Sequence, residues 1–151
     1  MASLFAKLQY KNQETILLLN APAEFQPYLT EIVEQAHIDN APDGDKRYDF
    51  AIVFVKSGAE VAASSALAST HMNDDAVLWF AYPKKSSQKY QTDINRDHGW
   101  QPLGDLGYEP VRQVAIDADW SALRFRTASH IKSMTRGFAM SEEGKRRTKK
   151  S

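Results

Sequence analysis

The chain has 151 residues and a mass of 17.0 kDa, the size of one domain with its own hydrophobic core. Positive and negative side chains balance, and the absence of cysteine excludes disulfides, thiolate metal sites and a cysteine nucleophile. No segment approaches the roughly 20 apolar residues of a membrane helix, and residues 1–10 lack the apolar stretch of a signal peptide. We therefore expect a cytoplasmic protein without a membrane partner.

The first half of the chain alternates apolar runs with helical spacing. Residues 4–8 predict a short leading helix, and the run T-I-L-L-L-N at residues 15–20 predicts a buried strand. Apolar residues at helical spacing over residues 25–32 predict a helix, and a weak second strand is expected at residues 33–38. The run Y-D-F-A-I-V-F-V at residues 48–55 is the clearest buried strand.

The second half begins with Ser57-Gly58-Ala59-Glu60, which matches a capping box and predicts an alanine-rich helix ending near residue 70. The polar turn H-M-N-D-D then leads to a strand at residues 76–82. Short helices are expected at residues 92–98 and 100–106, divided by Gly99.

Two strands are expected at residues 109–117 and 121–126, and their short connection makes them an antiparallel hairpin. In the second of these strands Arg124 alternates with Leu123 and Phe125, so Arg124 needs a carboxylate partner, expected to be Glu109 or an aspartate. The whole order predicts an α/β fold: a mostly parallel sheet of about six strands that closes with the hairpin, with helices on both faces.

The charge is distributed unevenly, because residues 1–126 carry 12 Lys and Arg against 17 Asp and Glu, whereas residues 127–151 carry 7 against 2. We expect residues 1–126 to form the domain and residues 141–151 to be a disordered basic tail, which either solubilises the protein or makes weak nucleic-acid contacts. Residues 127–140 predict a short amphipathic helix. That helix either docks on its own domain or, through residues 128–140, forms an oligomer.

Two motifs carry a resemblance to a known group of proteins. L-W-F-A-Y-P-K-K with T-D-I-N-R-D-H-G-W, and A-I-D-A-D-W-S-A-L-R-F-R, resemble the W-x-x-Y-P-K and W-S-A-x-R motifs of small bacterial proteins of unknown function with a methyltransferase-like fold. The resemblance extends over about residues 4–126 and implies a Rossmann-like domain. It brings no activity with it.

The turn after the first strand departs from that family. Methyltransferases of this type hold S-adenosylmethionine with a glycine-rich turn, whereas this chain has Asn20-Ala21-Pro22-Ala23 there. For the acidic residue that usually holds the ribose, only Asp39 is available. The sequence therefore predicts a degenerate cofactor turn, no cofactor and no methyltransferase activity.

Several polar residues are predicted to meet where the strands end. Ligands of open α/β sheets bind outside the carboxyl ends of the strands. Lys84 and Lys85 are the candidate clamp for an anionic small molecule, and the alternative is that Asp117 and Asp119 merely neutralise them. The candidate ligand-binding residues are Asn20, Lys56, Tyr82, Lys84, Lys85, Ser87, Arg96, Trp120 and Ser121.

Catalytic signals are weak. Ser121 stands in W-S-A and not in the G-x-S-x-G turn that exposes a nucleophile, and H-M-N-D-D matches a polar turn as well as a metal site. We therefore assign neither a catalytic residue nor a metal ligand. The sequence favours a non-catalytic binding or interaction module; the alternative is an enzyme acting on a phosphorylated or nucleotide substrate at the Lys84 and Lys85 edge.

Overall fold

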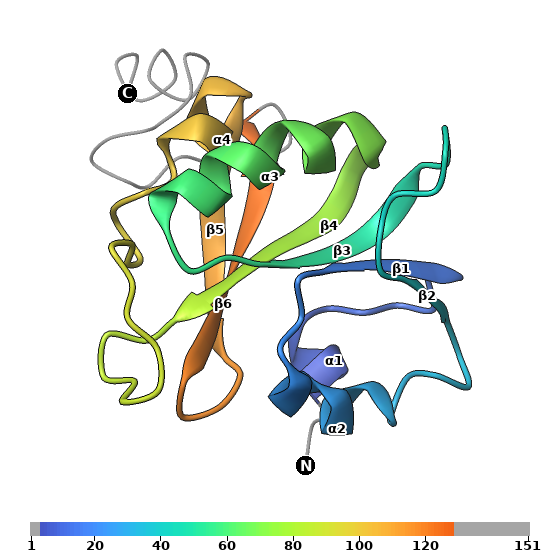
Figure 1. Cartoon of the computed structure of the whole chain (residues 1–151). Helices are drawn as coiled ribbons and strands as arrows, with labels where there is room; N and C mark the ends of the chain where they lie inside the picture. Colours follow the sequence, from blue (N-terminus) through green and yellow to red (C-terminus); the bar gives the residue numbers. More distant parts are fainter. Residues whose placement is uncertain (1–3, 129–151) are drawn as a thin grey trace.

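The computed structural model describes residues 4–128, apart from the side chains of residues 67–69. Its centre is a six-stranded sheet in the order β2-β1-β3-β4-β6-β5 (Figure 1). The strands β1 to β4 pair in parallel, whereas β6 is antiparallel to both β4 and β5. The predicted α/β sheet of six mostly parallel strands with a closing hairpin is confirmed. The strands are β1 (Thr15–Leu19), β2 (His37–Asp39), β3 (Tyr48–Phe54), β4 (Met72–Pro83), β5 (Tyr108–Ala115) and β6 (Trp120–Thr127).

Helices cover both faces of the sheet (Figure 1). The short helices α1 (Leu4–Lys7) and α2 (Gln26–Leu29) lie on one face, and a 3-10 turn, η1 (Ala23–Phe25), leads into α2. The opposite face carries α3 (Gly58–His71) and α4 (Gln101–Asp105). Helix α2 has a proline in its first turn, where the missing N–H costs no hydrogen bond.

Strand β3 is apolar on both sides because helices bury both sides. Alternate residues Phe50, Ile52 and Phe54 pack toward α1 and α2, whereas Ala51 and Val53 pack toward α3 and α4. Burying such a side chain contributes about 1.5–3 kcal/mol. The continuous apolar run that predicted this strand is therefore the signature of its central place in the sheet.

The predicted serine cap at the start of α3 forms, with the Glu60 side chain reaching the residue before the cap. Ser57 has an extended backbone, and its Oγ accepts a hydrogen bond from the Glu60 backbone N–H at 3.2 Å. Glu60 Oε1 in turn accepts from the Lys56 N–H at 3.2 Å. Ser57 is thus a helix cap.

Three local predictions differ from the structure. The turn expected at H-M-N-D-D is the start of β4, and the weak second strand is confined to β2, at the end of the predicted range. Residues 92–98 form no helix, because Asn95 and His98 pair through their backbones in a tight turn. Asp93 accepts a hydrogen bond from the Gly58 N–H at 2.8 Å, which joins this loop to the start of α3.

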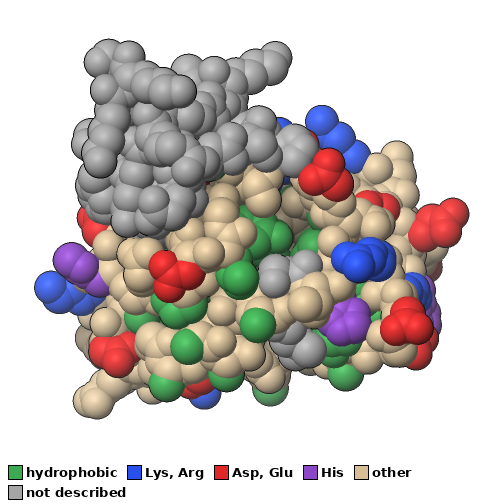
Figure 2. All heavy atoms as spheres, turned by 90° about the horizontal axis from the view of Figure 1, so that it is seen from above, with side chains coloured by type: hydrophobic (Ala, Val, Ile, Leu, Met, Phe, Trp, Pro, Cys, Tyr) green, Lys and Arg blue, Asp and Glu red, His purple; other side chains and the backbone are tan. Residues whose placement is uncertain are grey.

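Acidic and basic side chains are interspersed on the face formed by α3 and α4, as Figure 2 shows from above. Within residues 4–128 no helix is long and apolar enough to cross a membrane. The predicted helix at 127–140 lies outside the described residues except for Thr127, which ends β6, and Ala128. The predicted tail at 141–151 lies wholly outside them, and the domain limits remain a prediction.

Candidate functional site

The strand order reverses at the carboxyl end of β1, and we call the region between the chain segments that follow β1 and β3 the crevice. Strand β1 lies between β2 and β3 (Figure 1). The chain therefore passes from β1 to its neighbour β2, and then crosses back past β1 to its other neighbour, β3. Ligands of open α/β sheets bind outside the strand ends where successive connections diverge in this way. Residues that follow β1, β2 and β3 therefore define the candidate site.

The turn after β1 takes a left-handed backbone without glycine. Asn20 has φ of 61°, a conformation that asparagine tolerates better than other side chains. Its Nδ2 lies 3.5 Å from the Phe54 carbonyl oxygen at the end of β3, so it spans the crevice. The missing glycine therefore does not prevent a tight turn.

The end of β2 supplies a carboxylate. Asp39 pairs with Leu17 of β1 and ends the strand, which settles its register. The hydrogen bond from the Tyr48 hydroxyl, with Lys46 Nζ at 3.2 Å and His37 Nε2 at 2.9 Å, lowers the pKa of Asp39 despite its burial. A carboxylate has about four acceptor positions, so three partners leave one available.

Glu24 joins three segments at the same edge of the sheet. Its carboxylate accepts hydrogen bonds from the Tyr90 hydroxyl at 2.7 Å, Trp120 Nε1 at 3.1 Å and Lys89 Nζ at 3.2 Å. Burial alone raises the pKa of Glu24, but these donors outweigh it and lower the pKa to about 2. The loop at residues 84–100 is thereby fastened to η1 and to the hairpin.

The pKa of Glu24 predicts how stability depends on pH. Because its folded pKa of about 2 lies below the ordinary 4.5, the carboxylate stabilises the fold above about pH 4.5 and loses that effect as pH falls toward 2. Glu24→Gln should lower the melting temperature at pH 7, and the difference from wild type should shrink below pH 4. Thermal unfolding from pH 2 to 8 measures this. The exposed Glu34→Gln is the control, and an equal loss in both variants would contradict the prediction.

Lys56 and Lys89 both lie close to the Tyr90 ring. Lys56 Nζ is 5.2 Å and Lys89 Nζ 5.6 Å from the ring centre, within the range of a cation–π contact. Hydrogen bonding to Glu24, followed by burial, raises the pKa of the Tyr90 hydroxyl, which is therefore a neutral donor at pH 7. Lys56 remains exposed at the crevice.

The predicted lysine clamp is not neutralised by the hairpin aspartates. Asp119 accepts from Ser87 Oγ at 2.8 Å, and Asp117 accepts from the backbone N–H groups of Asp119 and Trp120 within its own turn. No ion pair of Lys84 or Lys85 is found among the described residues. Their binding of an anion stays a prediction.

The other predicted site residues are only partly available to a ligand. Trp120 is 1% exposed and packs edge-on against Phe54, and Ser121 is also buried. The Tyr82 ring is buried, and its hydroxyl accepts from Gln113 Nε2 at 2.9 Å. Arg96 is exposed in the loop before α4. The structure therefore groups Asn20 and Lys56 at the crevice, whereas Trp120 and Ser121 are buried at the start of β6, beside the end of β4.

Sequence reasoning missed Glu24, Lys89 and Tyr90. Glu24 is 66 residues from Tyr90 and 96 from Trp120, so no local pattern signals their contact. Among the described residues, no group of three or more His, Asp or Glu side chains is placed to hold a metal ion. His71 Nδ1 instead lies 3.2 Å from the Lys46 carbonyl oxygen.

Solved structures share this arrangement of strands and helices. The glycopeptide N-methyltransferase MtfA in complex with S-adenosylmethionine is 11% identical with a TM-score of 0.52, covering 82% of this chain and 91% of its own. The N-methyltransferase NodS from Bradyrhizobium japonicum WM9 in complex with S-adenosylhomocysteine is 11% identical with a TM-score of 0.51, covering 80% and 81%. The fold is that of Rossmann-like methyltransferases. No protein-family model and no curated protein matches the chain.

This finding corrects the functional interpretation of the sequence. A non-catalytic module and an absence of methyltransferase activity were expected from the turn without glycine, and both expectations are wrong in the light of methyltransferases with the same fold, two of them with bound cofactor or its product. Asn20 shows why the turn was a poor guide, because its backbone takes the positive φ that a glycine usually provides in such a turn. Likeness at 11% identity shows the fold, and activity is a separate question.

Proposed function

We propose that the chain is a methyltransferase that binds S-adenosylmethionine in the crevice between β1 and β3. The observation that carries the proposal is the left-handed Asn20 directly after β1, at the point where the strand connections diverge. Methyltransferases of the same fold with bound cofactor or product support it. The substrate is not part of the proposal.

The residues around the crevice suit the groups of this cofactor. The remaining acceptor position of Asp39 and the exposed amide of Asn40 are suited to ribose hydroxyls, for which carboxylate and amide oxygens are good acceptors. The exposed Lys56 is suited to the carboxylate of the methionine part. When bound, the cofactor supplies an electrophilic methyl group on a sulfonium sulfur. The cofactor carries no phosphate, so it needs no glycine-rich phosphate cradle.

The chain's own contribution to the reaction is positioning. The loop at residues 84–100 borders the edge and is held there by Glu24 through Lys89 and Tyr90. Orienting two reactants in contact removes entropy from the barrier, and a fastened loop keeps that geometry. The single O–H of Tyr90 donates to Glu24, so Tyr90 offers an acceptor molecule its ring face and its oxygen as a hydrogen-bond acceptor, and as a neutral phenol it does not remove a proton.

Isothermal titration with S-adenosylmethionine and S-adenosylhomocysteine tests the proposal. We expect both to bind, and we expect Asn40→Ala and Lys56→Ala each to weaken binding about tenfold, which corresponds to about 1.4 kcal/mol. Both side chains are exposed, so the variants should fold normally.

Lys11→Ala is the matched control, because Lys11 is exposed and precedes β1, at the opposite end of that strand. It should bind like wild type. An absence of binding at millimolar cofactor would overturn the proposal, as would equal weakening by the control.

A further inference from the structure

Three arginines lie on one side of the β5–β6 hairpin. The register places Arg112 of β5 directly opposite Arg124 of β6, and Arg126 lies two residues further along β6. Side chains two residues apart in a strand point to the same face, so all three share the face that α1 and α2 cover elsewhere. This arginine cluster lies away from the crevice beside β1, because β5 and β6 are at the other end of the sheet order.

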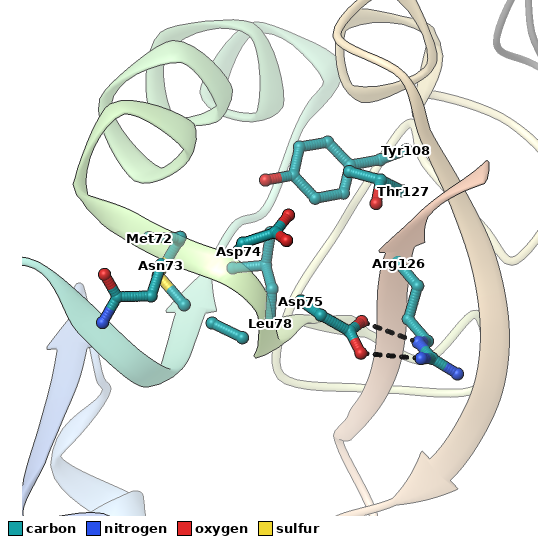
Figure 3. A pocket seen from close by; sticks show the side chains of 9 residues that line it. Met72, Asn73, Asp74, Asp75, Leu78, Tyr108, Arg126 and Thr127 are labelled. Carbon is teal, nitrogen blue, oxygen red and sulfur yellow. Dashed lines mark hydrogen bonds and ion pairs between the residues drawn. The ribbon is translucent and has the colours of Figure 1, made fainter. Parts of the chain in front are cut away.

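Arg126 is already paired. Its Nε and Nη2 donate to the two carboxylate oxygens of Asp75 at 3.0 and 2.8 Å, the bidentate geometry that suits a guanidinium (Figure 3). Asp75 is held for this contact in a left-handed backbone with φ of 54°. Both carboxylate oxygens of Asp75 thus accept hydrogen bonds from Arg126.

Arg124 lacks the carboxylate that its position calls for. Its Nη1 donates to the neutral side-chain oxygen of Gln9, and its buried Nε has no hydrogen-bond partner in the part of the chain described. Glu109, the expected partner, lies opposite Arg126 in the register. Burial lowers the pKa of Arg124, and the charges of Arg126 and Arg112 act in the same direction. A buried donor without a partner costs about 1–3 kcal/mol.

Arg112 adds a second positive charge beside this one. It is exposed, and no ion pair of Arg112 occurs among the described residues. Like charges directly opposite each other across an antiparallel pair destabilise it. The pair Arg112 and Arg124 therefore costs free energy by itself, and an anion that contacts both guanidinium groups relieves their repulsion.

We propose that Arg112 and Arg124 form a binding site for a phosphate group, as inorganic pyrophosphate or as a phosphate monoester. A carboxylate carries one negative charge, which a single guanidinium balances, as Arg126 balances the charge of Asp75. A phosphate group presents three or more oxygens around a tetrahedral centre, so it can engage two guanidiniums at once. Gln9, whose oxygen already accepts from Arg124, borders the site. The proposal is independent of cofactor binding at β1.

NMR titrations at constant ionic strength test the proposed phosphate site. The ligands are pyrophosphate, AMP as a phosphate monoester, and acetate as a carboxylate control. We expect backbone shifts to cluster at Gln9, Arg112 and Arg124, and the Arg124 Nε–H resonance to move. Pyrophosphate and AMP should both produce these shifts, and acetate should not. Shifts that cluster at Lys84 and Lys85, or an equal response to acetate, would overturn the proposal.

Variants complete the test. Arg112→Gln should weaken pyrophosphate binding about tenfold or more. Arg112→Lys should retain part of the affinity, because lysine keeps the positive charge but lacks the planar guanidinium that binds two oxygens. Lys85→Gln, which removes one exposed cation at the other site predicted to bind anions, should bind like wild type. Equal weakening in Arg112→Gln and Lys85→Gln would mean that only net charge matters and would refute the site. Because Arg112 is exposed, its removal should not impair folding.

Discussion

Trp79→Ala is expected to lower the free energy of unfolding by about 3–5 kcal/mol, the range for deleting a large buried aromatic side chain. Trp79 lies in β4, is 0% exposed and packs in the core between the sheet and the first two helices. Its Nε1 also donates to the Leu8 carbonyl oxygen at 2.8 Å, which ties the end of the α1 segment to the sheet. Urea unfolding measures the change.

Trp79→Phe separates packing from that hydrogen bond. Phenylalanine fills most of the space but leaves the Leu8 carbonyl unpartnered, so a smaller loss of about 1–3 kcal/mol is expected. Limited proteolysis should also cut near Lys7 and Lys11 faster in both variants than in wild type. The total free energy of unfolding of a typical domain is roughly 5–15 kcal/mol. A loss below about 1 kcal/mol in Trp79→Ala would show that this residue does not hold α1.

Gly99→Ala is expected to destabilise the protein by roughly 3–5 kcal/mol, because it combines backbone strain with overpacking. Gly99 has φ of 103°, and an added Cβ would lie 2.1 Å from Ile94 Cγ2 and 2.9 Å from Ile94 Cβ. Ile94 is buried in the core beneath α3 and α4, so it has little freedom to move. The variant should also loosen the loop that borders the candidate cofactor site.

Gly107→Ala is the matched control for this prediction. Gly107 also has a left-handed backbone, with φ of 94°, but an added Cβ would meet no atom within 4 Å. Its cost should therefore be backbone strain alone, about 1–2 kcal/mol. Thermal and urea unfolding of the two variants compare them directly. If both lose the same stability, the contact with Ile94 is not the cause.

The elements that sequence reasoning predicted well are those with strong local patterns. The run from Tyr48 to Phe54 is apolar on both faces, and Ser57 with Glu60 marks the start of α3, so both were found with boundaries within one residue or two. The helix predicted at residues 92–98 does not form, because polar side chains in this segment accept hydrogen bonds from nearby backbone N–H groups. Thr92 Oγ1 and Asn95 Oδ1 accept such bonds from Ile94 and Asp97.

The candidate site was only half predictable. That polar residues would gather at the carboxyl ends of the strands followed from the strand order, and Asn20 and Lys56 do lie there. The strand order did not predict which of these residues remain exposed. Trp120 was expected to contact a ligand, but Phe54 and Tyr90 pack around it and Glu24 accepts from its Nε1.

The sequence by itself determined the α/β class, the capped helix α3 and the closing hairpin, because each depends on the spacing of neighbouring side chains. Only the tertiary structure decided that the Asn20 side chain reaches the Phe54 carbonyl at the end of β3, that Glu24 joins the loop to the hairpin, and that Arg112 lies opposite Arg124. The physical reason is distance along the chain. These contacts join residues far apart in sequence, and strand pairing and register bring them together only when the sheet forms.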